Sequence, residues 1–410
     1  MSFRGVKMTI ILTIVGVQHK SFLVQLLAFI MATATICMAN AAPLDGITGS
    51  APQSNPQSNL ARSLGYRILL VPSQFQTIQL AVDSAKPGDS IKILPGTYVE
   101  QVNINKNLNV TGSGAADTFV KAPATLTPGS FGKLSIIDIN NGATVSLSNL
   151  TVTGPGSSPC GPGSLYGGIF VSGGANINLY AATVTKIHDT PKSFCFPNGS
   201  AIRIGQPFPA SDGHATIHNV EISEYQENGI LVLGSGSTAT IFESTITGFG
   251  AVPGVINGGV NVALGSSATV INNKISQNNC TSVGLLNCGR DPINQQQGAG
   301  IAIAGQSAAT SIISGNEIST SDIGIYLYGG ACTVTKNRIA NSRFFGIVLQ
   351  DSNYTVSLDH ITGGEIGVGV VADTTNTVGT LIKETITATS IAPVKEISAN
   401  TFKATAFIQK

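Results

Sequence analysis

Residues 324–371 read GIYLYGGACTVTKNRIANSRFFGIVLQDSNYTVSLDHITGGEIGVGVV, and this stretch contains one short pattern three times. Gly324, Gly346 and Gly367 are each followed by apolar residues in alternation, at intervals of 22 and 21 residues. Such alternation indicates short strands with one face turned inward. A strand-rich repeat of this length is typical of a solenoid, in which each coil of chain stacks on the previous one.

The pattern continues toward the N-terminus with longer and less regular spacing. It starts five more times, at Gly168, Ala201, Gly229, Gly259 and Gly300. The longer intervals, up to 41 residues, are interpreted as single coils that carry inserted loops. Most coils also contain a second strand, within residues 215–223, 239–247, 268–276, 332–340 and 354–362. The sequence therefore predicts an all-β right-handed parallel β-helix over residues 64–380.

Small polar residues recur at one corner of successive coils. The position two before the last apolar residue of the second strand is Ser244, Asn273, Asn316, Asn337 and Asp359. Such side chains tolerate a bent backbone and are able to hydrogen-bond each other from coil to coil. We therefore interpret Asp359 and His360 as a corner pair and not as a catalytic pair.

The two ends of the solenoid differ. In the segment 74–86, Ile78, Ala81, Val82 and Ala85 form one apolar helix face, which predicts a short N-terminal capping helix. Residues 381–410 are expected to form a C-terminal cap or a last irregular coil, because residues 391–393 interrupt the repeat.

The N-terminal region reads as an export signal. Residues 1–42 contain basic residues, then an apolar stretch and a small-x-small cleavage site at 39–41, which predicts a signal peptide. Residues 43–63 are rich in Pro, Ser, Asn and Gln and are interpreted as a flexible linker. We expect a protein that is secreted or located at the cell surface or in the periplasm. The alternative is an uncleaved leader, through which alone the protein would contact a membrane.

The composition excludes several classes of protein. Charged residues make up 10% of the chain, which is too few for a long coiled coil or a charge-rich disordered protein. The 22 Lys and Arg residues nearly balance the 21 Asp and Glu residues. Because nothing concentrates positive charge, we expect no nucleic-acid partner.

The segment FQTIQLAVDSAKPGDSIKILPGTYVEQVNINKNLNVTGSG (75–114) resembles the opening segment of pectin-lyase-like right-handed β-helix proteins. With the repeats, the resemblance extends to about residue 375. The superfamily includes pectate lyases, pectin methylesterases, polygalacturonases, alginate epimerases and exported β-helix proteins without known activity. The resemblance implies a fold and a polysaccharide as partner, but its residues cap and turn the chain and specify no reaction.

The catalytic motifs of these enzymes are largely missing. Gly96, Tyr98 and Glu100 match a Gly-x-Tyr-x-Glu element of pectin methylesterases, without the paired aspartates expected later. Gly213-His214 lacks the second glycine of the polygalacturonase Gly-His-Gly motif. Pectate lyases hold calcium with clustered aspartates, and no such cluster appears in the sequence. No cofactor is therefore expected, with calcium left open.

The repeated strand also argues against a catalytic face. Its sixteen outward positions contain one arginine and no acid, whereas uronate-processing sites need several converging carboxylates or bases. We expect this apolar face to be covered by long loops or by a partner. The positions are Phe170, Arg203, Leu231, Asn261, Ala302, Tyr326, Val348 and Gly369, and Ser172, Gly205, Leu233, Ala263, Ala304, Tyr328, Gln350 and Val371.

The loops hold the remaining catalytic candidates. Stacking of coils is expected to bring Asp189 near Glu224 or Glu227, with Arg203 between them and His188 adjacent, as an acid/base pair. The competing interpretation is a solvated loop with a surface ion pair.

Two further sets of side chains bear on the binding of sugars and of metal ions. Tyr326 and Tyr328, with Tyr225, are candidates to stack on sugar rings, or else to pack beneath a loop. His214, His218 and Asp212 lack a fourth ligand, so no metal site is predicted.

The cysteines fit an exported protein. Cys160 and Cys195 lie before repeated strands in adjacent coils, and Cys280 and Cys288 lie in one inserted loop, so each pair predicts a disulfide. Cys332 starts a strand and is expected to be a buried thiol.

Three functions remain. The first is an exported β-helix that presents a surface for polysaccharide or cell-envelope contacts, and it is favoured because catalytic motifs are missing. The second is a polysaccharide lyase, epimerase or glycoside hydrolase with a loop-based site. The third is an adhesin or structural stalk.

Overall fold

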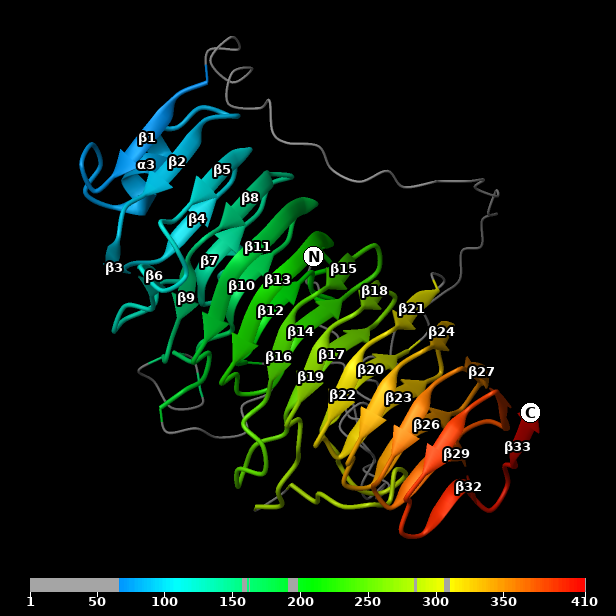
Figure 1. Ribbon diagram of the computed structural model, residues 1–410. Coiled ribbons are helices and arrows are strands. Elements are labelled where there is room, and N and C mark those ends of the chain that lie inside the picture. The colour runs from blue at the N-terminus through cyan, green and yellow to red at the C-terminus, as the bar shows by residue number, and fades with distance from the viewer. Residues whose placement is uncertain are drawn as a thin grey trace, which may run out of the picture.

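The computed structural model describes residues 66–156, 161, 163–190, 198–283, 286–305 and 310–409. The chain winds into successive coils of short strands that stack along one axis (Figure 1). Each strand pairs in parallel with its counterpart in the next coil. The prediction of a right-handed parallel β-helix is confirmed. The signal peptide and linker predicted for residues 1–63 lie outside the described residues.

One sheet is formed by the repeated strand of every coil. Its eleven strands pair in order along the solenoid, and their apolar inner side chains stack into a continuous core. They are β4 (Val102–Ile104), β7 (Ser135–Ile139), β10 (Gly167–Val171), β12 (Ser200–Ile204), β14 (Asn228–Leu233), β17 (Gly258–Ala263), β20 (Ala299–Ala304), β23 (Ile323–Tyr328), β26 (Phe345–Gln350), β29 (Ile366–Ala372) and β32 (Ala392–Ser398).

The second sheet contains two further tracks of strands, which merge in β11 (Ala175–Thr185) and β13 (Gly213–Ser223). The first track consists of β1 (Ile68–Val71), β2 (Ser90–Ile93), β5 (Leu108–Thr111), β8 (Thr144–Ser148), β15 (Thr238–Phe242), β18 (Ser267–Ile271), β21 (Ser311–Ser314), β24 (Cys332–Thr335), β27 (Asn353–Ser357), β30 (Thr377–Ile382) and β33 (Ala404–Gln409). The second track consists of β3 (Gly96–Val99), β6 (Thr118–Lys121), β9 (Thr151–Thr153), β16 (Thr245–Thr247), β19 (Lys274–Ser276), β22 (Glu317–Ser319), β25 (Arg338–Ala340), β28 (His360–Thr362) and β31 (Thr385–Thr387).

The repeated strand begins with a small residue because a larger side chain would not fit between the two sheets. A Cβ atom on Gly324 would lie 2.5 Å from Cγ2 of Ile339, which belongs to the third strand of the same coil. Gly346 has the same relation to Ile361, also at 2.5 Å. Real Cβ contacts are never this short, so glycine lets the two sheets approach until the isoleucine fills the interior.

The predicted corner ladder is confirmed. The Asn273 backbone N–H and side-chain amide both donate to Oδ1 of Asn316 at 3.0 Å. Asn316 donates in the same way to Asn337, and Asn337 to Asp359, at 2.7–3.0 Å. The Asp359 backbone N–H then donates to Glu384 at 3.3 Å, which adds one more coil to the ladder.

The predicted capping helix is also confirmed, as α3 (Ile78–Ser84) at the N-terminal end of the solenoid (Figure 1). Carboxylate oxygens of Glu100 accept from the Ile78 and Gln79 backbone N–H groups, each at 2.9 Å. At the other end of α3, Lys106 Nζ donates to the Val82 and Ala85 carbonyls at 3.1 and 3.2 Å. The glutamate of the Gly-x-Tyr-x-Glu element therefore has a structural role here, because it caps a helix.

The C-terminal expectation needs correction. Residues 381–409 form a regular last coil and not an irregular one, because β31, β32 and β33 pair in parallel with β28, β29 and β30. Pro393 fits within β32 since this strand is the last in its sheet. The β-helix therefore extends to residue 409.

We predict that Glu100→Ala lowers the free energy of unfolding by about 1–2 kcal/mol, because two helix N–H groups lose a charged acceptor. Equilibrium urea unfolding measures the change. The control is Glu221→Ala, which removes an exposed carboxylate on β13. Equal stability of both variants would contradict the capping role.

The carboxyl groups at the end of the ladder predict that the stability of the last coil depends on pH. Burial raises the pKa of Asp359 to about 6, and burial and the neighbouring Asp359 raise the pKa of Glu384 to about 8. Raised carboxyl pKa values mean that the folded state holds protons that the unfolded state has lost. The stability of the last coil should therefore fall as the pH rises from about 4 to about 8.

Hydrogen exchange of residues 385–409 as a function of pH tests this expectation. Glu384→Gln should remove most of the pH dependence, whereas Glu221→Gln should leave it unchanged. A last coil whose protection does not depend on pH in the unmodified protein would refute the argument.

Candidate functional site

The outward face of the sheet that runs from β4 to β32 is covered between β7 and β29, whereas Asn103 on β4 and Lys395 on β32 are exposed. The sixteen outward positions fall into two register columns, as the alternation predicts. None of their side chains is exposed, and only Asn261 and Tyr328 are half-buried. The expectation that loops cover this face is confirmed where described loop residues pack on it, at Phe170 and at the cluster around Tyr326.

The covering loops are residues 124–134, 163–166, 249–257 and 286–298. Tyr166 packs on Phe170 with ring centroids 5.3 Å apart, and Ile293 packs against the cluster that contains Tyr326 and Phe345. The same register column contains Asp138 on β7, which the repeat pattern does not identify because this strand lacks the initial glycine. Asp138 is buried and accepts from the Ser130 backbone N–H at 2.5 Å, so it anchors a loop.

Arg203 lies buried beneath the first of these loops. Its guanidinium carbon is 4.1 Å from the centroid of the Tyr166 ring, and Lys133 Nζ lies 4.8 Å from the same centroid. Burial lowers the pKa of Arg203, while Tyr166 and Glu227 act in the opposite direction. The aromatic ring and the carboxyl group compensate part of the cost of burying this charge.

Asp189 is buried and fully engaged. It accepts from Ser164 Oγ at 2.5 Å, from the Leu165 backbone N–H at 3.1 Å and from Gln226 Nε2 at 3.2 Å. Because three donors from separate segments bind this one carboxylate, Asp189 holds these segments together and has a structural role.

Glu227 differs from Asp189, because it is buried and neither of its carboxylate oxygens has a hydrogen-bond partner among the described residues. Burial raises the pKa of Glu227 well above its usual range, Arg203 lowers it and Asp189 raises it. The side chain lines a cavity of about 20 Å³ together with Asn228, Asn257, Asn261, Gln297 and Tyr326, among others. We call this space the Glu227 cavity.

The predicted catalytic candidates thus divide into two groups. Asp189, Arg203 and Glu227 interact electrostatically in the interior, and the alternative of a solvated loop is wrong for these three because all are buried. Glu224 is half-buried and does not line the cavity. The His188 ring contacts Phe249, with centroids 5.6 Å apart, and its Nδ1 bonds the Asp189 backbone carbonyl oxygen.

The tyrosine predictions are largely corrected. Tyr225 is fully buried inside a coil, where its hydroxyl donates to Asn278 at 2.5 Å, so it cannot stack on a sugar. Tyr326 packs beneath a loop and donates to Gln350 at 2.6 Å. Tyr328 is half-buried against the same cluster. Of the two predictions made for Tyr326, packing beneath a loop is therefore the correct one.

His214 and His218 lie on the outer face of β13. No metal site is predicted for them. His218 stacks between Tyr180 and Phe242, with centroids 5.3 and 5.0 Å away. His214 Nε2 lies 3.5 Å from Asp212. Across the described ranges, no three His, Cys, Asp or Glu side chains group as metal ligands. In the same ranges, no helix is long and apolar enough to cross a membrane.

The Cys280–Cys288 disulfide is confirmed, with a Cα–Cα distance of 5.6 Å. Cys160 and Cys195, the other predicted pair, lie outside the described residues. Cys332 is a free thiol but only half-buried, because it lies at the start of β24 with its strand neighbour exposed. Burial still raises its pKa to about 12.

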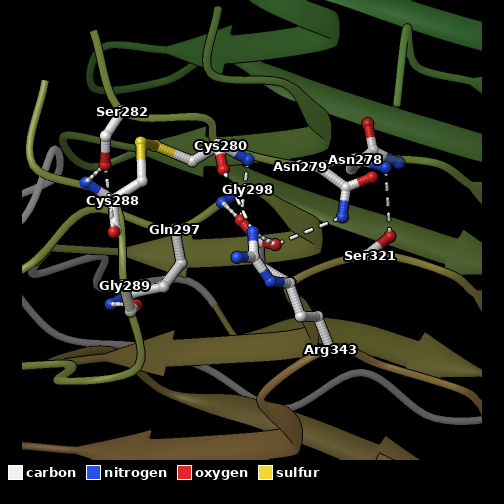
Figure 2. A network of polar contacts seen from close by, with 11 residues as sticks. Asn278, Asn279, Cys280, Ser282, Cys288, Gly289, Gln297, Gly298, Ser321 and Arg343 are labelled. Carbon is white, nitrogen blue, oxygen red and sulfur yellow. Dashed lines mark hydrogen bonds and ion pairs between the residues drawn. A yellow bond between two sulfur atoms is a disulfide. The ribbon is translucent and has the colours of Figure 1, made fainter. Parts of the chain in front are cut away.

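Asp322 anchors both ends of the loop that carries this disulfide. Its side chain is fully buried and accepts from the Cys280 N–H at 2.7 Å and the Gly298 N–H at 3.0 Å. Asn279 Nδ2 donates to its other oxygen at 3.2 Å, and Arg343 Nη1 lies 3.6 Å from that oxygen. Figure 2 shows these groups converging below the disulfide, with Gln297 nearby. One carboxylate therefore holds a loop that forms part of the cavity wall.

We predict that Asp322→Ala destabilises the closed loop by about 3 kcal/mol, because two backbone N–H groups and Arg343 lose their acceptor. Hydrogen exchange of residues 286–298 should rise strongly. Glu317→Ala, which changes an exposed acid of the same coil, is the control and should not alter exchange there. Unchanged protection in Asp322→Ala would show that other contacts hold the loop.

Comparisons with known proteins bear on the fold. Residues 209–382 match the family model described as right-handed β-helix region. No curated protein sequence matches this chain.

Solved structures with similar folds were also found. The Agl-KA catalytic domain aligns with a TM-score of 0.54 and 16% identity over 80% of this chain and 64% of that chain. This chain thus spans less than two thirds of that structure. The catalytic domain of a GH87 α-1,3-glucanase in complex with tetrasaccharides gives a TM-score of 0.47 and 15% identity over 88% and 70% of the two chains. An alginate lyase from Paenibacillus sp. str. FPU-7 gives 0.42 and 13% over 82% and 99%.

At such identities the likeness concerns the fold and not the reaction. The stacked parallel sheets, the capping helix and the family match agree with the resemblance of the opening segment. The chain therefore has the fold of a right-handed parallel β-helix, and residues 209–382 match the family model of that region.

Proposed function

We propose that this protein is an exported, non-catalytic β-helix that binds polysaccharide along its exposed outer face. The observation that carries the proposal is that none of the sixteen outward positions between β10 and β29 is exposed. The Glu227 cavity beneath the covering loops measures about 20 Å³. Pockets for small-molecule ligands usually measure roughly 300–1,000 Å³, so a sugar ring does not fit there.

The exposed face of the second sheet offers a different surface. One register column along β13, β15, β18, β24, β27 and β30 presents a threonine from each strand to solvent. These residues, exposed or half-buried, are Thr216, Thr240, Thr269, Thr333, Thr355 and Thr380, with Ile312 interrupting the series. Neighbouring strands lie about 4.8 Å apart, so the hydroxyl groups form a regular row. A linear polymer of hydroxylated units is a ligand that such a row is able to follow by repeated hydrogen bonds.

Export is supported by the sequence pattern of residues 1–42 and by the Cys280–Cys288 disulfide, which persists in oxidising compartments. Polysaccharide as the ligand class is supported by the resemblance of the opening segment.

A second candidate function is polysaccharide cleavage at Glu227. The observation that favours it is a buried carboxyl group with a raised pKa beside Asp189 and Arg203, which is a combination found at acid/base sites. Cleavage would require the covering loops to open.

We expect the purified protein to bind members of a panel of uronic-acid and neutral polysaccharides without releasing unsaturated products or reducing ends. Replacing Thr240, Thr269 and Thr333 together by valine removes three exposed hydroxyl groups and keeps the β-branched shape. Binding should weaken about tenfold or more, since each hydrogen bond contributes about 0.5–1.5 kcal/mol.

The matched control replaces Thr247, Thr362 and Thr387 by valine, in the neighbouring column along β16, β28 and β31. It should bind like the unmodified protein. Product formation that Glu227→Gln abolishes would establish the enzymatic candidate instead. Equal loss of binding in both triple variants would exclude the threonine row as the binding surface.

A further inference from the structure

Three exposed cations lie along one corner of the last coils. Lys336 and Arg338 flank the ladder residue Asn337, and Lys383 precedes the ladder residue Glu384 two coils later. The side chains of Lys336, Arg338 and Lys383 are all exposed. The ion pairs formed among the described residues include none of the three. We call these three residues the basic corner.

Shared backbone contacts align the basic corner with the axis of the solenoid. The backbone N–H groups of Lys336, Leu358 and Lys383 each donate to a strand carbonyl of the following coil, at 2.9–3.1 Å. These residues therefore occupy equivalent positions in three successive coils. Because neighbouring strands lie about 4.8 Å apart, Lys336 and Lys383 are separated by roughly 10 Å along the axis.

The charge of this corner changes sign along the solenoid. In the register column of Arg338, Glu221 is an exposed acid four coils earlier. Lys274 and Glu317 lie between them on neighbouring strands, and their charges balance. The basic corner is therefore a local excess of positive charge in a chain whose total charge is nearly zero.

The two acids of the ladder beneath the basic corner offset only part of its charge. Asp359 is buried and Glu384 is half-buried. Burial raises the pKa of Asp359 to about 6, and burial and Asp359 together raise the pKa of Glu384 to about 8. At pH 7 Glu384 is therefore mostly neutral, and the three cations are opposed mainly by Asp359.

The basic corner follows the threonine row at a constant distance along the chain. Lys336 comes three residues after Thr333 of β24, and Lys383 comes three residues after Thr380 of β30. Hydroxyl groups and cations therefore run side by side over the coils of β24, β27 and β30. A ligand that follows the threonine row meets positive charge along one of its sides.

We propose that the polysaccharide bound along the threonine row is acidic, with its anionic groups over the basic corner. The inference rests on the proposed function and adds the class of its ligand. Attraction between single exposed charges is weak and screened by salt, so binding depends on several contacts along one chain. A linear polymer with a repeated anionic group supplies these contacts, because the cations also recur along a line.

Affinity gel electrophoresis of the full chain compares carboxymethylcellulose with hydroxyethylcellulose, an acidic and a neutral polymer with the same backbone. We expect tighter binding to carboxymethylcellulose, and this preference should shrink as the NaCl concentration rises. Replacing Lys336, Arg338 and Lys383 together by glutamine should weaken binding to carboxymethylcellulose about tenfold. An unchanged affinity in this triple variant would overturn the proposal.

The matched control replaces Lys86, Lys92 and Lys121 together by glutamine. These three lysines are exposed near the N-terminal end of the solenoid, so the control loses the same charge away from the basic corner. It should bind carboxymethylcellulose like the unmodified protein. Equal weakening in both triple variants would mean attraction by overall charge and would reject the basic corner as the site.

The two polymers also separate this inference from the proposed function. Equal binding of both polymers, lost in the threonine-to-valine variant, would overturn the acidic ligand and leave the threonine row standing. Binding to neither polymer, nor to any member of the polysaccharide panel, would reject both proposals. Duplex DNA is a further arm: equally tight binding of DNA through the same three residues would mean that the corner attracts any polyanion, which rejects the polysaccharide class.

Discussion

The close contact between the glycine of the repeated strand and the isoleucine of the third strand sets the cross-section of every regular coil. No side chain stands between Gly324 and Ile339, or between Gly346 and Ile361, so the two sheets approach until their aliphatic side chains interlock. A methyl group at either glycine would overlap the partner isoleucine. Because each coil has the same thickness, the strands of neighbouring coils meet in register over the whole solenoid. The core, the ladder and the covered face all depend on that register.

The covered face follows from where the chain places its inserted loops. The outward face of the sheet from β4 to β32 consists largely of apolar side chains such as Phe170, Leu231 and Val348, which water would solvate poorly if they were uncovered. Loops that fold back over them remove this surface from solvent, and buried carboxylates hold the loops in place. Asp189 and Asp322 each accept from two or more loop donors, and Asp138 accepts from the Ser130 N–H of one loop. These three aspartates therefore serve loop attachment, whereas Glu227 interacts electrostatically with Arg203 and accepts no hydrogen bond from the described part of the chain.

The fold could be predicted from the sequence because it is periodic, and each coil repeats the same evidence. The strand track, the corner ladder and the capping helix involve contacts at fixed spacing, so alternation and position suffice. The loops have no period, and their contacts join residues at irregular separations, such as Gln226 to Asp189. For that reason stacking indicated that Asp189, Arg203 and Glu227 approach each other, but not that they are buried. The error at the C-terminus has a related cause, since Pro393 breaks the sequence pattern without breaking the edge strand that contains it.

The ladder at the corner has a direction. Every side-chain oxygen in it accepts from the backbone N–H of the preceding coil, from Asn273 through Asp359 to Glu384. The two ends of the solenoid also differ within the described residues: α3 packs over the core at the first, while β32 and β33 are the last paired strands at the second. A coil duplicated near the C-terminus would meet a neighbour ready to pair with it, and one placed before α3 would not. The described architecture therefore accepts an added coil more readily beside β32 and β33 than beside α3.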